Sequence, residues 1–116
     1  MIAGAKQGVE FHDLSTQMVL AHSIVLHVFT RRALDCIITC GSDGTHSNKS
    51  LHYSGNALDY RTRHMTETEA IEVHAEIRKQ LPKDFDVVNH PREILAGVVK
   101  SPGHLHIEYQ PRRPRQ

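Results

Sequence analysis

A short segment near the C-terminus alternates polar and apolar residues in a way that could present catalytic side chains. The segment His104–Tyr109 (HLHIEY) predicts a β-strand, and side chains two residues apart on a strand lie on the same face. His104, His106 and Glu108 should therefore point one way, while the apolar residues between them point into the core. Two imidazoles about 7 Å apart along a strand suit one metal ligand and one neighbouring acid/base group. An exposed polar face would give the same alternation, so the motif needs support from another segment.

That support comes from Ser50–Asp59 (SLHYSGNALD), in which a histidine and an aspartate lie on either side of a glycine turn. Gly55 lets the backbone take a conformation that is closed to other residues. Asp59, on the strand that follows, could then meet His52 at a common ion. With His106 these side chains make three protein ligands and leave a position for water. That is the layout of a catalytic zinc site, whereas a structural zinc site is closed by four protein ligands.

The two segments resemble the signatures of the zinc D-Ala-D-Ala metallopeptidases, a family grouped with lysostaphin-type peptidases and the hedgehog signalling domain. Ser50–Asp59 matches the family pattern S-x-H-x-x-G-x-A-x-D at every fixed position, and His104–His106 matches its second pattern, H-x-H. The resemblance extends from about Ile37 to Pro111, with the two motifs in the expected order. The residues that follow each motif, Asp59–Thr62 and His106–Tyr109, look most like those of the small family members carried by tailed phages.

The resemblance implies roles for individual residues. It assigns Zn²⁺ to His52, Asp59 and His106, and it places His104 at the reacting centre. In another branch of the family a glutamate three residues before the last ligand is the general base. Gly103 occupies that position here, so the glutamate branch does not fit and His104 is the expected acid/base group.

Four further residues are expected to support the site or bind substrate. Ser50 is predicted to give hydrogen-bond support to the first motif, and Glu108 to orient an imidazole. Many relatives carry a substrate-anchoring arginine upstream of the first motif, and Asp43 lies near that place here. Arg61, which would share a strand face with Asp59, could substitute, as could Arg92, although a surface or structural role fits each equally well. The missing arginine weakens the case for a carboxypeptidase and leaves an endopeptidase open.

The function implied by the resemblance is zinc-dependent hydrolysis of peptide bonds in the stem peptides of bacterial peptidoglycan. Such an enzyme would be phage-derived, acting in lysis or as part of a virion. One alternative is a structural virion or assembly protein that keeps the fold with little or no activity. Another is a zinc-stabilised binding module, which would need a fourth protein ligand that the motifs do not supply.

Composition limits the remaining possibilities. The 116 residues predict one domain, 1–116, with a flexible basic tail at 111–116. A net charge of +1 argues against nucleic acid as a partner. The longest apolar stretch, around Met18–Phe29, is too short to cross a membrane, and no signal peptide is evident. We therefore expect synthesis in a bacterial cytoplasm and action on the cell wall after release or from a virion. Cys36 and Cys40 are interpreted as buried thiols, with neither a disulfide nor a metal between them.

Helices and strands are expected to alternate irregularly along the chain. Apolar residues at helical spacing predict a helix over about 12–31, and a capping box at Thr66–Glu69 opens another over 67–80. Strands are predicted at 34–39, 57–62, 84–89 and 104–109, with a short helix within 91–99. This order indicates an α+β fold with a small antiparallel sheet flanked by helices, of the type that the hedgehog and D-Ala-D-Ala-peptidase resemblance implies.

Overall fold

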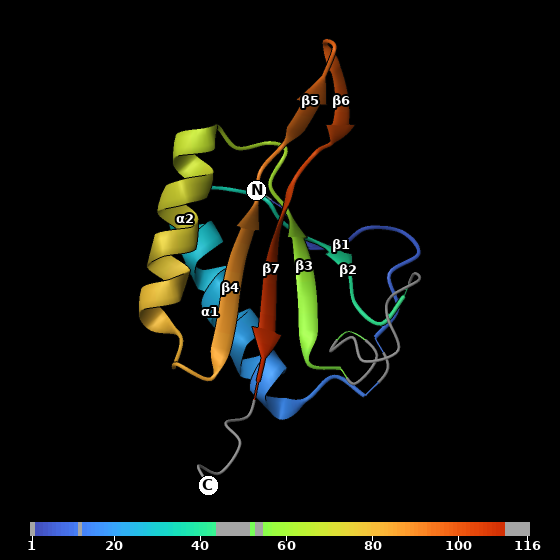
Figure 1. The fold of residues 1–116 in the computed structure, drawn as a ribbon. Coiled ribbons are helices and arrows are strands. Elements are labelled where there is room, and N and C mark those ends of the chain that lie inside the picture. The colour runs from blue at the N-terminus through green and yellow to red at the C-terminus, as the bar shows by residue number, and fades with distance from the viewer. Residues whose placement is uncertain (1, 12, 44–51, 53–54, 111–116) are drawn as a thin grey trace, which may run out of the picture.

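The computed structural model describes residues 2–11, 13–43, 52 and 55–110, and it has an α+β architecture (Figure 1). Five strands form one mixed sheet, two helices lie against it, and two further strands form a separate hairpin. The elements in chain order are β1 (Ala3–Ala5), α1 (Thr16–Arg31), β2 (Cys36–Cys40), β3 (Ala57–Arg61), α2 (Glu67–Gln80), β4 (Phe85–His90), β5 (Glu93–Leu95), β6 (Val98–Ser101) and β7 (His104–Tyr109).

The main sheet has the strand order β1-β2-β3-β7-β4. The pairs β2–β3, β3–β7 and β7–β4 are antiparallel, as predicted, whereas β1 pairs with β2 in parallel. The predicted purely antiparallel sheet is therefore corrected to a mixed one. β1 was not predicted, because three small residues (AGA) carry no alternation, and their register comes from pairing with Cys36–Ile38.

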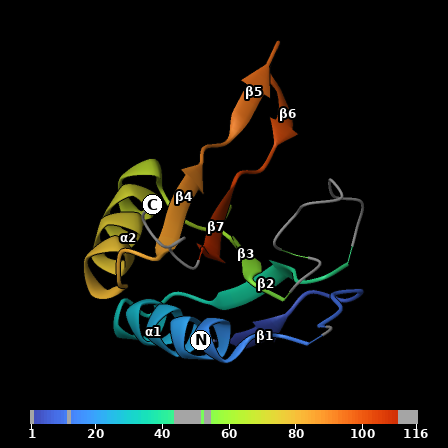
Figure 2. The same ribbon diagram turned by 60° about the horizontal axis from the view of Figure 1, so that its bottom comes forward.

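Both helices cover the same face of the sheet (Figures 1 and 2). No helix of the described residues lies over the opposite face, which we call the uncovered face. The buried stripe of α1 consists of Met18, Ala21, Val25, Val28 and Phe29. These residues join the inward side chains of the central strands in one apolar cluster, which includes Leu58, Tyr60, Leu105 and Ile107. Burial of this area supplies most of the driving force for folding, so the helix-covered face is the core.

Capping decides where the helices begin. The Ser15 side chain accepts a hydrogen bond from the Met18 amide at 3.2 Å, so α1 begins at Thr16 rather than near residue 12. The predicted capping box of α2 is confirmed, because the Thr66 hydroxyl accepts from the Glu69 amide and the Glu69 carboxylate accepts from the Thr66 amide. The predicted range of α2, 67–80, is also confirmed.

Side chains of α2 cover the outer edge of β4. The His74 Nε2 donates to the Val87 carbonyl at 2.7 Å, and Arg78 donates to the Phe85 carbonyl. Unpaired carbonyls at the edge of a sheet invite pairing with another chain. These two side chains occupy acceptors at that edge, so His74, which carried no signal in the sequence, has a structural role.

The prediction of a short helix within 91–99 is wrong. Residues Glu93–Leu95 and Val98–Ser101 form an antiparallel hairpin that projects from the body of the protein (Figure 1). Ala96 and Gly97 both have positive φ, 52° and 77°, as in the two-residue turns that connect tight hairpins. The adjacent valines favour a strand over a helix, because their branched side chains lose rotamer freedom in a helix.

No helix within the described residues is long and apolar enough to cross a membrane.

Candidate metal centre

Strands β3 and β7 place the predicted polar residues on the uncovered face of the sheet. Their antiparallel register sets Asp59 opposite His106, and Arg61 opposite His104. Along β7 the apolar residues Leu105 and Ile107 are buried, and the intervening residues are partly exposed. The alternation predicted for β7 is thus confirmed. The pairing of β7 with β3 brings together side chains that are far apart in the sequence.

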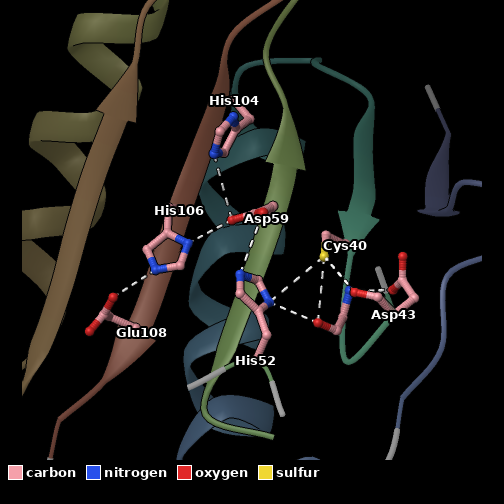
Figure 3. A network of polar contacts seen from close by, with 8 residues as sticks. Cys40, Asp43, His52, Asp59, His104, His106 and Glu108 are labelled. Carbon is pink, nitrogen blue, oxygen red and sulfur yellow. Dashed lines mark hydrogen bonds and ion pairs between the residues drawn. The ribbon is translucent and has the colours of Figure 1, made fainter. Parts of the chain in front are cut away.

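Two of the three predicted ligands, His52 and His106, lie against the third, the carboxylate of Asp59 (Figure 3). The His106 Nδ1 lies 2.7 Å from Asp59 Oδ1, and the His52 Nε2 lies 3.5 Å from Asp59 Oδ2. The side chains of His52, Asp59 and His106 are only 6%, 14% and 16% exposed. Each carboxylate oxygen therefore faces a different imidazole in a site largely shielded from water.

Backbone contacts around Gly41 and Gly55 fix the orientation of His52. The His52 Nδ1 lies 2.7 Å from the Gly41 carbonyl, which can only accept, so this nitrogen carries the proton. In the neutral ring, Nε2 then bears the lone pair, and this is the nitrogen that faces Asp59. The Gly55 amide donates to the His52 carbonyl at 3.2 Å. Gly55 has φ of 74°, and a Cβ there would lie 2.2 Å from the Asp13 carbonyl oxygen. The predicted need for glycine at this turn is confirmed.

The Asp43 carboxylate stabilises the turn at Gly41. Its Oδ1 accepts hydrogen bonds from the Gly41 amide at 2.8 Å and the Glu10 amide at 3.1 Å. Burial alone would raise the pKa of Asp43, but these hydrogen bonds prevail and lower it. Asp43 thus holds Gly41, the residue whose carbonyl accepts from His52, so its geometry is that of a supporting residue rather than a substrate contact. Ser50, predicted as another support, lies outside the described residues.

His106 lies between two carboxylates. Its Nδ1 faces Asp59, and its Nε2 lies 2.7 Å from Glu108 Oε1. Burial opposes the charged ring, but the hydrogen bonds to Asp59 and Glu108 outweigh it and raise the pKa of His106. Burial would likewise raise the pKa of Asp59, yet hydrogen bonds from His106 and His52 hold it well below the usual range. Glu108 therefore occupies the predicted orienting position, with Nδ1 of His106 directed at Asp59.

His104 stands beside this group at the more open end. Its Nε2 lies 3.9 Å from Asp59 Oδ1, and its side chain is 36% exposed. The ring of His90 stacks on it, with centroids 4.5 Å apart and planes 25° from parallel. Burial lowers the pKa of His104, which favours the neutral ring. The neutral ring keeps one nitrogen with a lone pair that can accept a proton.

The two arginines considered for substrate binding lie in different places. Arg61 lies directly opposite His104 on the uncovered face, as predicted. Arg92 donates to the Arg63 carbonyl at 3.3 Å and lines a pocket of about 450 Å³ together with His90 and the start of α2. Arg61 is therefore the arginine next to the candidate acid/base group.

The structure adds a donor that the sequence interpretation missed. Cys40, His52 and Asp59 each offer a ligand atom, and these three atoms all lie within 4.8 Å of one another. Burial raises the pKa of the Cys40 thiol to about 11, and the charges of Asp59 and Asp43 add to this effect. The two cysteines form no disulfide, as predicted. The prediction of a buried thiol is confirmed for Cys36, which lies in the core, whereas Cys40 is partly exposed beside His52 and Asp59.

Among the described residues, Cys40, His52 and Asp59 form a group that could hold a metal ion. Metal–ligand distances of about 2.0–2.2 Å in a tetrahedral zinc site place neighbouring N and O donors about 3.3 Å apart. The separations of 2.7 Å and 3.5 Å between Asp59 and the two histidines lie on either side of that value. His106 adjoins the group of Cys40, His52 and Asp59 through its contact with the Asp59 carboxylate.

Comparisons with protein-family models, with curated proteins and with solved structures found no match to this chain.

Proposed function

We propose that this protein is a zinc-dependent peptidase that hydrolyses peptide bonds in the stem peptides of bacterial peptidoglycan. The observation that carries the proposal is the convergence of His52 and His106 on Asp59, with His104 at the rim. The resemblance of Ser50–Asp59 and His104–His106 to the zinc D-Ala-D-Ala metallopeptidases predicts the same four residues. We also assign the mixed sheet with helices on one face to the hedgehog and D-Ala-D-Ala-peptidase type of fold.

In the proposed site, His52, Asp59 and His106 hold Zn²⁺, which when bound polarises a carbonyl and makes water a stronger acid. The Nε2 of His104 accepts the proton of the attacking water and delivers it to the leaving amine. Stacking on His90 restricts the plane of the His104 ring. Glu108 and the Gly41 carbonyl orient the two ligating imidazoles from the side away from Asp59.

A peptide substrate would reach these groups beside His104, whose side chain is 36% exposed. Arg61, opposite His104, has the charge and position to contact a substrate carboxylate. A free C-terminal carboxylate there would make the enzyme a carboxypeptidase, and an internal D-Glu carboxylate would make it an endopeptidase. Both forms would act on the cell wall, either after release from the cell or from a virion.

Digestion of purified muropeptides, followed by mass spectrometry, tests the proposal and identifies the bond. We expect cleavage that a chelator abolishes and Zn²⁺ restores. His104→Ala should keep the metal but lose about 10²–10⁴-fold in rate, because general acid/base catalysis contributes about that much. His27→Ala is the matched control, since His27 is exposed on α1, which packs against the opposite face of the sheet.

Two results would contradict the proposal. Native turnover by His104→Ala would remove the assigned role of that histidine. Failure of the metal-loaded protein to cleave any muropeptide would favour the structural virion or assembly protein instead.

A further inference from the structure

The β5–β6 hairpin concentrates apolar side chains on an exposed part of the molecule. All residues from 91 to 100 are exposed. They include four large apolar residues, each more than half exposed, which we call the apolar tip: Ile94, Leu95, Val98 and Val99. Among the described residues, no third strand pairs with this hairpin. Contiguous exposed apolar side chains are typical of a contact surface, because their burial away from water is favourable.

Both faces of the hairpin are apolar. Leu95 pairs with Val98 next to the turn, and Ile94 pairs with Val99 one step further from it. Cross-strand partners point to the same side of a hairpin and neighbouring residues point to opposite sides, so each face carries one apolar pair. A globular protein packed on one face would leave the other pair in water. The boundary layer of a lipid bilayer would surround the tip and cover both pairs.

The length of the apolar tip fits a shallow insertion. The three residues from Ile94 to the turn residue Ala96 span about 10 Å at about 3.3 Å a residue. Interfacial segments bury their apolar groups about 5–10 Å into the boundary between headgroups and acyl chains. The outer edges of β5 and β6 carry backbone groups that have no strand partner among the described residues. Such groups need water or headgroups, so the hairpin should stop in this boundary layer.

Cations gather at the base of the hairpin. Arg92 immediately precedes β5, and Lys100 lies near the end of β6. Arg92 donates to the Arg63 carbonyl at 3.3 Å, which brings the exposed Arg63 to the same end of the molecule. Glu93 is the only acidic residue between positions 91 and 101. The base is therefore cationic, and lysine and arginine near a membrane surface are attracted to anionic lipids.

We propose that the β5–β6 hairpin attaches this protein to the surface of an anionic lipid bilayer, with the apolar tip in the boundary layer and Arg92 and Lys100 at the lipid phosphates. The inference does not rest on the proposed function. A surface contact of this kind is distinct from a membrane span, which the sequence does not predict. The hairpin projects from the end of the sheet at which β7 begins with His104 (Figure 1). Attachment would therefore turn the His104 end of the candidate site towards the lipid.

Tryptophan fluorescence tests the contact directly, because the chain contains no tryptophan of its own. The full-length Leu95→Trp variant should shift its emission to the blue on addition of vesicles that mix phosphatidylcholine with phosphatidylglycerol. Lipids with brominated acyl chains should quench that emission. Leu20→Trp is the matched control, because Leu20 on α1 and Leu95 are 62% and 64% exposed. The emission of the control should not change with lipid.

Sedimentation with the same vesicles measures the apolar and charged contributions separately. The double variant Leu95→Ser and Val98→Ser should bind about tenfold more weakly or less, because it removes two apolar side chains from the tip. Lys100→Gln should weaken binding to the anionic vesicles about fivefold and leave binding to phosphatidylcholine alone unchanged. Thermal unfolding of these variants should match that of the natural chain, because the hairpin side chains lie outside the core cluster.

Three results would overturn the inference. The first is an emission of Leu95→Trp that does not change with anionic vesicles, and the second is an equal shift in Leu20→Trp. The third is a blue shift that appears without lipid and grows with protein concentration, which would mean that a second copy of the chain covers the tip. A lipid-dependent shift in a protein that cleaves no muropeptide would support the membrane contact and remove only the peptidase.

Discussion

Strands β3 and β7 present very different chemistry to their two sides. On the helix-covered side, Leu58, Tyr60, Leu105 and Ile107 are 0–1% exposed and pack in one apolar cluster. On the uncovered side, Asp59 and His106 are also largely buried, yet they meet through polar atoms, and His106 makes a second polar contact with Glu108. Apolar packing is non-directional, whereas a buried carboxylate needs particular partners at particular distances. Substitutions on the helix-covered face should therefore change the stability of the fold, and substitutions on the uncovered face should change metal binding. We expect each kind of substitution to have little effect on the other property.

The largest effect that would sharpen this contrast is expected from Asp59→Asn. The carboxylate is the contact common to His52 and His106, and an amide is a weak metal ligand. Loss of an orienting residue around a metal typically costs 10–100-fold in affinity, so loss of the shared ligand should cost more than about 100-fold. Titration calorimetry with Zn²⁺ measures the change. Zinc affinity equal to that of the natural chain would remove Asp59 from the ligand set.

The adjacent residue provides the opposite perturbation. Leu58→Ala, on the same strand but facing the helices, should lower the free energy of unfolding by about 2–5 kcal/mol. The refolded fraction should bind Zn²⁺ with unchanged affinity, because Leu58 is fully buried on the far side from Asp59. Urea denaturation of the metal-free protein gives the stability, and calorimetry gives the affinity. A variant that is stable but cannot bind zinc would mean that the two faces are coupled.

A smaller effect is expected from Glu108→Gln. Glu108 contacts the Nε2 of His106, so the substitution should weaken Zn²⁺ binding by about 10–100-fold while leaving the ligands in place. Asp86→Asn is the matched control, because Asp86 lies directly opposite Glu108 on β4 but is exposed. Equal losses in the two variants would point to general electrostatic attraction of the cation rather than orientation of His106.

Local patterns were enough for much of the fold. The capping box fixed the start of α2, and strict alternation gave β7 and the face of each of its residues. Predictions failed where pairing partners decided the structure. Three small residues became β1 only by pairing with β2, and the 91–99 segment became a hairpin through two consecutive residues of positive φ.

The candidate site divides in the same way. His52, Asp59, His104, His106 and Glu108 were identified from two motifs, and the structure brings all five onto one face. The role of Asp43 as a hydrogen-bond acceptor at the Gly41 turn could not be predicted, because it involves the Glu10 amide, more than thirty residues away along the chain.

By itself, the sequence identified the candidate site residues of β7 and the face of the strand that they occupy, because alternation along a regular strand is a local property of the backbone. Only the tertiary structure decided that Cys40 lies beside His52 and Asp59. One extra residue between Ile38 and Cys40 reverses the direction of the side chains that follow, and that bulge exists only in the pairing of β2 with β3.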